Sequence, residues 1–388
     1  MYLKSLELKN YRNYDHIDLD FDKDSILLVG NNGKGKTNML ESIHYLSAGR
    51  SHRTHVQDEL LKWGREYTLI RGKILSGNKR TRHLVEIEIR KDNDLKIKVD
   101  GIYRSKKADF ISILPSVIFS PDDLKIIKSD AGERRNFLDS ILEKIYRDYS
   151  SLRLQYQKIL AQRNSLLKSV TGRLTGSHLD TLDAWNDNLV KYGLHIMMRR
   201  NELVASIRES FRDRIKTFFK DTVPEIQYIF SWERNGKTQQ DCLPETDVIA
   251  DSISLRETFK RKLEENLDSD IIRKSTAAGP HRDDMAVFFD GRDIRSFGSQ
   301  GQQRIAAISL KLCEIQVLKE RLNTDPVLLL DDVLSELDMQ RRERLVGIIS
   351  GRFQTFVTAT NISYLDKLDI DFGSRFLVKD DNIVKMEL

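Results

Sequence analysis

Eight residues near the start of the chain have the types and spacing of a phosphate-binding loop. Residues 30–37 read GNNGKGKT and fill every fixed position of the pattern GxxxxGK[ST]. In such a loop, backbone N–H groups and the N-terminus of the next helix bind phosphate oxygens. Lys36 would reach the β- and γ-phosphates, and the Thr37 hydroxyl would ligate Mg²⁺. The expected nucleotide-binding residues are Gly30, Asn31, Asn32, Gly33, Lys34, Gly35, Lys36 and Thr37.

A second element of phosphate chemistry lies nearly three hundred residues further along the chain. The apolar run VLLL, residues 327–330, ends in Asp331 and Asp332. A buried strand of an open α/β sheet presents such side chains at its carboxyl end, where these sheets bind ligands. We therefore expect Asp331 to hold Mg²⁺ with Thr37, and Asp332 to orient or deprotonate the attacking water. Lys36, Asp331 and Asp332 are the candidate catalytic residues.

The segment SFGSQGQQR, residues 296–304, precedes an amphipathic run from Ile305 to Leu318. The N-terminus of that helix predicts a second anion site. One nucleotide needs only one such cradle, so a second indicates either another ligand or a composite site between two copies of the chain. The simpler alternative is a polar loop whose Ser299 caps the helix. The later segment SELD, residues 335–338, also has a simpler alternative, which is that it begins a helix.

The secondary structure that must position these residues consists mainly of strands towards both ends of the chain and of helices in its middle. Residues 2–8, 84–89 and 95–99 alternate as half-buried strands do, with Asp100–Gly101 as a turn. Apolar spacings of three and four predict one helix from Leu138 to Gly172 and a second from Trp185 to Phe218. At about 32 residues each and ~1.5 Å per residue, an antiparallel arm would extend roughly 50 Å. A buried helical pair folded against the sheet is the alternative.

Composition predicts a soluble cytoplasmic protein of two to three domains. The chain has 388 residues, of which 39% are hydrophobic, and no apolar run approaches the roughly 18 residues of a membrane span. The start of the chain lacks the apolar stretch of a signal peptide. Its two cysteines, Cys242 and Cys313, give neither a disulfide framework nor a metal-ligand spacing, so a reducing compartment is expected.

The order of these motifs resembles that of the ATP-binding-cassette heads of SMC-like proteins. Three further stretches sharpen the resemblance: LKNYRNY at 8–14, FSPDDLKIIKSDAGERRNFLDS at 119–140 and AGPHRDDM at 278–285. With a terminal strand TFVT at 355–358, the chain is similar to the bacterial RecF family over essentially its whole length.

The resemblance implies an α/β ATPase head with a mixed sheet around the phosphate-loop helix and a helical lobe inserted between its two parts. The expected domains are 1–120 with the phosphate loop, 121–270 as the helical lobe, and 271–388. The last domain contains the segment SFGSQGQQR, here called the signature segment, and the strand that ends in Asp331 and Asp332, here called the acidic strand. ATP, with Mg²⁺, would pair two copies. Ser299, Gln300, Gly301 and Gln302 would touch the γ-phosphate on the opposite subunit, and Asp338 would link the two sites. Arg12 and Asn13 lie where SMC-like heads place contacts to nucleotide.

Departures from the wider cassette pattern limit the expected mechanism. Ser120–Pro121–Asp122 stands in place of a glutamine loop, and Thr358–Ala359–Thr360 in place of a switch histidine. Asp332 is one methylene shorter than the usual catalytic glutamate. We therefore expect slow hydrolysis, with ATP binding as the clamp and hydrolysis as the release. His281 is either a distant substitute for the histidine or, as we favour, a hydrogen-bonded residue in a Gly-Pro turn.

A DNA ligand is indicated by the resemblance and by local charge. Residues 151–220 carry 13 Lys or Arg against 6 Asp or Glu, in a chain whose net charge is +5. Such charges bind phosphate backbones without reading sequence. Candidate contacts are Lys106, Lys107, Arg134, Arg135, Arg199, Arg200 and Arg208. A solvated helix face is the alternative for any one of them. Reversing Arg199, Arg200 and Arg208 to Glu is expected to weaken duplex binding.

The function implied by the resemblance is an ATP-gated DNA clamp of recombinational repair and replication-fork maintenance, with a weak DNA-stimulated ATPase. It would bind duplex, gapped DNA and single-strand/double-strand junctions as a homodimer. Its partners would be RecR, with RecO and RecA in the same pathway. It would not bind a membrane. Two alternatives from other classes are a small-molecule kinase, which needs no signature segment, and a nucleotide-switched adaptor whose ligand is a protein.

Overall fold

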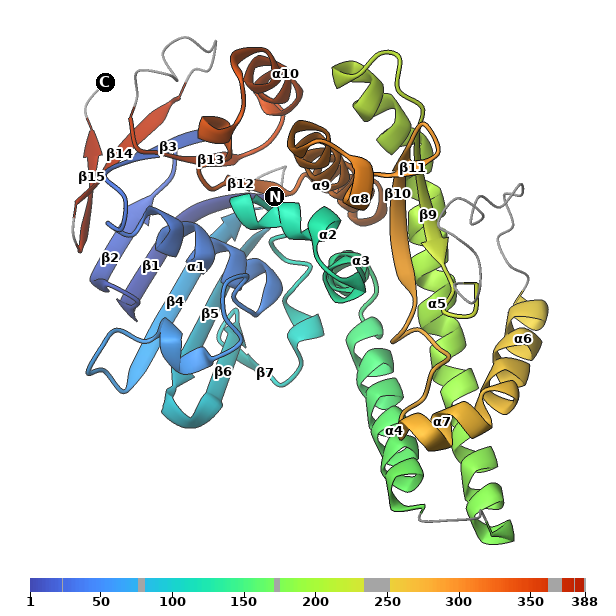
Figure 1. The fold of residues 1–388 in the computed structure, drawn as a ribbon. Coiled ribbons are helices and arrows are strands. Elements are labelled where there is room, and N and C mark those ends of the chain that lie inside the picture. The colour runs from blue at the N-terminus through green and yellow to red at the C-terminus, as the bar shows by residue number, and fades with distance from the viewer. Residues whose placement is uncertain are drawn as a thin grey trace. The chain divides into compact units, whose positions relative to one another are not determined.

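The computed structural model describes residues 1–22, 24–75, 81–170, 175–233, 252–361, 372–379 and 381–386. The chain divides into two compact units (Figure 1). Unit 1 comprises Met1–Asp123 and Glu314–Leu388, and unit 2 comprises Leu124–Cys313. The second unit begins close to the expected position 121 but extends past 270, so that it includes the signature segment at 296–304. Helix α9 (Gln300–Leu322) begins in unit 2 and ends in unit 1.

The first sheet of unit 1 is antiparallel, with strand order β2-β1-β4-β5-β6-β7. Its strands are β1 (Tyr2–Tyr11), β2 (Tyr14–Asp20), β4 (Tyr67–Leu75), β5 (Arg82–Arg90), β6 (Asp94–Val99) and β7 (Ile102–Arg104). Asp100 and Gly101 both have positive φ, 53° and 79°, and join β6 to β7. The predicted strands and turn in this part of the chain are confirmed.

The second sheet of unit 1 carries the two phosphate-chemistry strands. Its order is β15-β14-β3-β13-β12-β8, and all neighbours are parallel except β14 and β15. The strands are β3 (Ser25–Val29), β8 (Ser116–Phe119), β12 (Val327–Leu330), β13 (Thr355–Ala359), β14 (Ser374–Lys379) and β15 (Asn382–Met386). Because β13 pairs with both β3 and β12 in parallel, the phosphate-loop strand and the acidic strand end at the same edge.

Helix α1 (Lys36–Ala48) packs against both sheets of unit 1, contacting β4 of one and β8 and β13 of the other. Its residues Met39, Leu40 and Ile43 are fully buried in the core cluster that both sheets line. Helix α10 (Met339–Ile349) follows the acidic strand. The first turn of α1 is thus held rigidly at the edge where β3 and β12 end.

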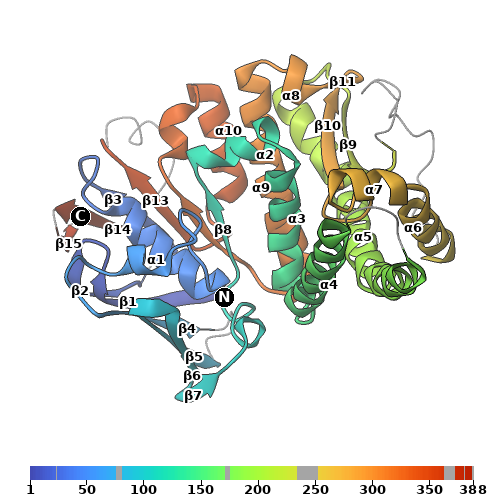
Figure 2. The same cartoon turned by 60° about the horizontal axis from the view of Figure 1, so that its bottom comes forward.

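Unit 2 is mainly helical, with a small antiparallel sheet of order β11-β10-β9. Its strands are β9 (Pro224–Ile229), β10 (Asp284–Phe289) and β11 (Arg292–Asp293). Its helices are α2 (Lys125–Lys128), α3 (Ala131–Ile145), α4 (Tyr149–Ser169), α5 (Gly176–Phe218), α6 (Ser252–Glu265), α7 (Leu267–Arg273) and α8 (Ile294–Phe297). Helix α5, with 43 residues, packs against α3, α4, α6 and β9 (Figures 1 and 2).

The prediction of one helix from Leu138 to Gly172 is wrong, because α3 and α4 are separate helices. Tyr146, with φ −112° and ψ 112°, leaves the helical conformation after α3. The apolar spacing continues across this break without a Gly or Pro, so periodicity alone could not reveal it. The second predicted helix, Trp185 to Phe218, is confirmed within α5. Helix α5 packs on α4, as the predicted hairpin requires, and it also contacts α6 and β9 of the small sheet in unit 2. The projecting arm stays a prediction.

A buried polar cluster ties three helices of unit 2 together. The fully buried guanidinium of Arg163 on α4 donates to Asn186 on α5 at 2.9 Å and to Asp270 on α7 at 2.8 Å. Arg163 also donates to Thr276 at 2.8 Å. Removing one partner of such a pair leaves an uncompensated charge in a region without water.

We expect Arg163→Met to lower the free energy of unfolding by about 3–5 kcal/mol, because Asp270 would remain buried without its guanidinium. Urea denaturation followed by circular dichroism measures the change. The control is Lys260→Met, which breaks the exposed pair of Lys260 with Asp187 in the same unit and should cost at most about 1 kcal/mol. Equal small losses in both variants would show that the buried cluster does not stabilise unit 2.

Candidate functional site

The phosphate loop leaves the N-terminus of α1 open for an anion. Gly35, the residue before α1, has φ 108°, a conformation that side chains with a Cβ rarely adopt. Within the described part of the chain, no side chain caps this end of α1, and its first turn has no acidic residue. The first N–H groups of the helix are therefore unsatisfied by the protein and suited to phosphate oxygens.

Residues of the β1–β2 turn support the loop from behind. The Tyr14 hydroxyl donates to the backbone carbonyl of Gly35 at 2.9 Å, and the side-chain oxygen Oδ1 of Asn13 accepts from Asn38 Nδ2 at 2.8 Å. A Cβ at Gly35 would lie only 2.6 Å from the Tyr14 hydroxyl, so this close approach requires glycine. Tyr14, which sequence reasoning did not select, positions the loop. Asn13 lies beside the first turn of α1, and its expected contact to nucleotide stays a prediction.

Arg12 makes contacts that hold α1 in place. Its guanidinium donates to both carboxylate oxygens of Glu41, at 2.9 and 2.7 Å, and to the Glu59 carbonyl at 2.7 Å. Burial opposes ionisation of Glu41, but the hydrogen bonds from Arg12 and Ser51 keep the pKa of Glu41 below its ordinary value. The structure gives Arg12 this structural partner, and its expected contact to nucleotide stays a prediction.

The structure brings the two phosphate motifs into direct contact. The Thr37 hydroxyl donates to Asp331 Oδ1 at 3.0 Å, across 294 residues of sequence. Lys36 Nζ donates to the carbonyls of Gly30 and Asn31, at 2.5 and 3.0 Å, within its own loop. Burial lowers the pKa of Lys36, and the charges of Asp332 and Asp331 act in the opposite direction. Lys36, Thr37, Asp331 and Asp332 thus form one cluster, as their spacing in the parallel sheet predicts.

Thr358, at the end of β13, fixes both acidic residues. Its hydroxyl donates to Asp331 Oδ1 at 3.0 Å and accepts from the backbone N–H of Asp332 at 2.9 Å. Burial raises the pKa of Asp331, and the hydrogen bonds from Thr37 and Thr358 work against that rise. In the sequence, Thr358 stands out only as a residue in the place of a usual histidine. Its role toward the two acids depends on β13 pairing with β12, which the sequence does not reveal.

The oxygens at this cluster fit a bound Mg²⁺ ion. Mg²⁺ in proteins is usually held by one or two carboxylates together with substrate phosphates and water. Thr37 Oγ1 and Asp331 Oδ1 converge at this point, while the buried Asp332 Oδ1 has no hydrogen-bond partner among the described residues. An unsatisfied carboxylate oxygen in such a place suits a metal-bound or attacking water. Mg²⁺, when bound, would neutralise charge on the β- and γ-phosphates.

The signature segment lies in unit 2 and forms a capping box. The Ser299 N–H donates to Gln302 Oε1 at 2.8 Å, and the Gln302 N–H donates to Ser299 Oγ at 3.2 Å. Gln300 and Gly301 begin α9, and Ser299 is exposed. Asp338 caps α10 by accepting from the Arg341 N–H at 3.0 Å. The simple capping interpretations therefore describe both segments in the single chain, and their roles toward a second copy stay predictions.

Two of the candidate DNA contacts are corrected by the structure. Arg134 is buried and donates to both carboxylate oxygens of Asp284, at 2.6 and 2.9 Å. Arg200 is buried and forms the same bidentate pair with Asp139, at 2.8 Å for both bonds. Neither guanidinium is exposed to a DNA backbone, because each compensates a buried carboxylate.

The other basic candidates differ in their surroundings. Arg199 forms a bidentate pair with Asp148, at 3.0 and 2.9 Å, and lies 4.4 Å from the centre of the Tyr146 ring. Arg208 and Arg135 are partly buried. Lys106 and Lys107 are exposed on unit 1. The two lysines are therefore the best placed of the set for a phosphate backbone.

His281 is a hydrogen-bonded residue in unit 2. Its Nδ1 accepts from the Tyr156 hydroxyl at 2.7 Å, and its Nε2 donates to the Thr276 carbonyl at 3.0 Å. Burial lowers its pKa to about 4, so the ring is neutral near pH 7. Both ring nitrogens are engaged, which confirms the interpretation of His281 as a structural residue of the Gly-Pro turn.

Comparisons with known proteins show the family of this chain. The family described as RecF/RecN/SMC N terminal domain matches residues 2–378. The chain is 38% identical to the DNA replication and repair protein RecF of Clostridium kluyveri, over all of both chains. It belongs to the RecF family. RecF of Bacillus subtilis is 35% identical over 99% of this chain and all of its own length.

Solved structures with the same fold include a RecF protein and Smc heads. The structure named as recombination mediator protein RecF-ATP in the RecFOR pathway matches with a TM-score of 0.87 and 33% identity, over 100% of this chain and 98% of that one. An Smc head bound to the C-winged helix domain of ScpA matches with a TM-score of 0.56 and 14% identity, over 100% and 98%. The predicted fold, an ATP-binding-cassette head of the RecF family, is confirmed. Among the residues that the structure describes, no helix combines the length and apolar content needed to cross a membrane.

We expect Thr358→Val, which keeps the shape but removes the hydroxyl, to raise the Mg²⁺ concentration needed for half-maximal ATP binding. Asp331 would keep only Thr37, and the Asp332 N–H would lose its acceptor. A loss of about 1.4 kcal/mol corresponds to a tenfold change, within the range for an orphaned buried donor. Titration of a fluorescent ATP analogue measures it. Thr358→Ser retains the hydroxyl and should behave as wild type; a Val variant that also does so would exclude this positioning role.

Proposed function

We propose that this chain is an ATP-dependent DNA-binding protein of recombinational repair and replication-fork maintenance. ATP with Mg²⁺ binds at the phosphate loop and pairs two copies of the chain. The paired form holds duplex DNA at gaps and single-strand/double-strand junctions, and slow hydrolysis releases it. The protein acts in the cytoplasm. RecR, with RecO and RecA in the same pathway, are the proposed partners, because solved relatives are named as parts of the RecFOR pathway.

The observation that carries this proposal is the hydrogen bond between Thr37 and Asp331. It joins the two motifs that would hold phosphate and Mg²⁺, although they are far apart in sequence. Lys36 would contact the β- and γ-phosphates, and the Asp332 carboxylate would orient the attacking water. Asp332 is one methylene shorter than the usual glutamate, and Thr358 stands in place of the histidine of other cassettes. Few groups are therefore positioned to accept a proton from the attacking water. Slow turnover follows from this arrangement.

Pairing of two copies is supported by the second helix N-terminus of unit 2. Ser299 is exposed; its hydroxyl accepts from the Gln302 N–H, and its own N–H donates to the Gln302 side-chain oxygen. A γ-phosphate from a second copy would replace the glutamine oxygen with a stronger, charged acceptor. This exchange would couple dimer formation to a triphosphate, because ADP lacks the phosphate that reaches across.

The decisive experiment is to size the purified protein with ATP, ADP or no nucleotide, each with and without duplex DNA. The proposal expects dimers only with ATP, strengthened by DNA. Lys36→Met, which removes the phosphate contact, and Ser299→Arg, which blocks the signature, should both remain monomeric. Ser299→Arg should still bind ATP, because its change lies in unit 2.

Other outcomes would point to the alternative functions. A monomer that hydrolyses ATP equally well with Ser299→Arg would favour a kinase, for which the signature has no role. ATP-dependent dimers whose stability and nucleotide affinity do not respond to DNA would favour an adaptor for a protein ligand.

For the DNA contacts, we expect Lys106→Glu with Lys107→Glu to weaken duplex binding. Each lost phosphate contact lowers the slope of log affinity against log salt concentration by about 0.9, so the slope should fall by up to about 2. Fluorescence anisotropy across a salt series measures it. The control, Lys379→Glu with Lys385→Glu, makes the same charge change at exposed positions of the β14–β15 hairpin. Equal effects of the two pairs would mean that only overall charge matters.

The reversal of Arg199, Arg200 and Arg208 is not a useful test of DNA binding. Arg200→Glu would place two carboxylates together in a buried site with Asp139. The variant would therefore lose stability whether or not α5 contacts DNA.

A further inference from the structure

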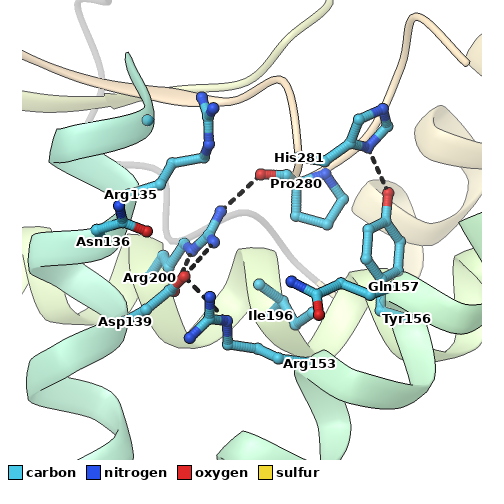
Figure 3. Close-up of a pocket in the computed structure, with 11 residues that line it drawn as sticks. Arg135, Asn136, Asp139, Arg153, Tyr156, Gln157, Ile196, Arg200, Pro280 and His281 are labelled. Carbon is cyan, nitrogen blue, oxygen red and sulfur yellow. Dashed lines mark hydrogen bonds and ion pairs between the residues drawn. The ribbon is translucent and has the colours of Figure 1, made fainter. Parts of the chain in front are cut away.

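Unit 2 contains a pocket that has no part in the nucleotide site. It has a volume of about 210 Å³ and lies where α3, α4, α5 and the turn before β10 meet (Figure 3). Its charged or polar lining residues are Arg135, Asn136, Asp139, Arg153, Tyr156, Gln157, Arg200 and His281. Two of the sequence stretches that carry the family resemblance, 119–140 and 278–285, contribute to this lining. Neither stretch places a residue in the phosphate and Mg²⁺ cluster.

The lining has more positive than negative charge. Three guanidinium groups, those of Arg135, Arg153 and Arg200, line it with a single carboxylate, that of Asp139. Asp139 is already satisfied, because it accepts from Arg200 at 2.8 Å, from Arg153 at 3.0 Å and from the Tyr149 hydroxyl at 2.6 Å. Outside the lining, Glu143 accepts from Arg153 at 2.6 Å. His281 adds no charge, since its pKa is lowered to about 4.

Arg135 is the guanidinium of the lining that forms no hydrogen bond with a carboxylate among the described residues, although Asp284 and Asp283 lie near enough to act on its charge. Its only hydrogen bond among the described residues goes to a neutral acceptor, the Asp283 carbonyl, at 2.7 Å. The carboxylate of Asp283 is itself used by the Tyr228 hydroxyl at 2.6 Å and the Ser231 N–H at 2.7 Å, and Asp284 is paired with Arg134. Burial, followed by repulsion from Arg200, lowers the pKa of Arg135. A partly buried cation beside another cation, without a carboxylate of its own, gains stability when an anion binds.

The size of the pocket restricts the anion. At about 210 Å³ it is smaller than the roughly 300–1,000 Å³ of sites for drug-sized ligands, so it suits a single charged group rather than a whole nucleotide. The planar donors of an arginine match the oxygens of a phosphate in pairs. Asn136 and Gln157, both exposed at the pocket, carry amide groups that can add neutral donors.

We propose that this pocket of unit 2 binds a phosphate group, with the Arg135 guanidinium as its main ligand and Arg153 beside it. The same chemistry is offered by a phosphate of a DNA backbone and by a small free phosphate. The DNA source rests on the function proposed above, whereas the binding of a free phosphate does not.

The first arm of the test measures binding of inorganic [³²P]phosphate to the full chain by equilibrium dialysis. Arg135→Gln should weaken it at least tenfold. Arg147→Gln is the matched control, because Arg147 is an exposed arginine of the same unit that does not line the pocket. Lys36→Met identifies any phosphate held at the phosphate loop. Phosphate binding lost in Lys36→Met but unchanged in Arg135→Gln would overturn the proposal.

The second arm measures duplex affinity of the same variants across a salt series by fluorescence anisotropy. A slope reduced by about 0.9 in Arg135→Gln, but not in Arg147→Gln, would identify a DNA phosphate as the ligand. Weaker phosphate binding with unchanged DNA binding would identify a small phosphate instead. Unchanged affinity of Arg135→Gln for both inorganic phosphate and duplex DNA would overturn the proposal that this pocket binds a phosphate group. Failure of the wild-type protein to bind DNA would count against the proposed function while the first arm still decides this inference.

A loss of folding in Arg135→Gln is separated from a loss of binding by thermal melting and by a second variant. Arg135→Lys keeps the charge and a donor for the Asp283 carbonyl but lacks the planar pair of donors. It should fold as wild type and bind phosphate with intermediate affinity. If the folded Arg135→Gln and Arg135→Lys variants both bind phosphate as tightly as wild type, the assignment of Arg135 as main ligand is wrong.

Discussion

The contact between Thr37 and Asp331 depends on the strand order of one sheet. The two residues follow β3 and β12, which do not pair with each other but both pair with β13. Their 3.0 Å hydrogen bond exists only when the first and last parts of the chain have folded into one unit. Local structure at either motif, a glycine-rich turn or a strand ending in acids, cannot make the site alone. Nucleotide affinity is thereby linked to the long-range order of unit 1, and any change that displaces β13 should affect both motifs together.

The motifs of this site could be predicted from sequence because each depends on short-range chemistry. Gly35 is needed for its positive φ, Thr37 for a hydroxyl one position into the helix, and Asp331 for a carboxylate at a strand end. The strands 84–89 and 95–99 and the turn at Asp100–Gly101 were equally local and were predicted correctly. What could not be predicted were partners brought together by the fold. Thr358 is an unremarkable residue in the sequence, yet it bonds both acids because β13 lies between β3 and β12.

The two wrongly predicted DNA contacts in unit 2 have one physical origin, which is burial of charge. Arg134 and Arg200 read as basic surface positions in a charge-rich segment, but each is paired with a buried carboxylate. A charge count cannot separate these arginines from exposed ones, since the partners Asp284 and Asp139 are distant in sequence. Buried pairs of this kind add little net stability, but they tolerate only one arrangement of the helices that carry them. Arg163 and Asp270 act in the same way between α4 and α7.

A single hydroxyl that serves two acids also constrains the chemistry of the nucleotide site. Asp332 has φ 54°, a left-handed conformation that aspartate tolerates better than most residues, and its N–H is held by Thr358. The backbone of Asp332 is thus fixed while its carboxylate oxygen Oδ1 stays without a partner. A glutamate at this position would carry the carboxylate one methylene further from β12, whereas the aspartate keeps it close to Asp331. The slow hydrolysis proposed above fits this arrangement, because the short side chain on a fixed backbone limits how far the carboxylate can reach toward an attacking water.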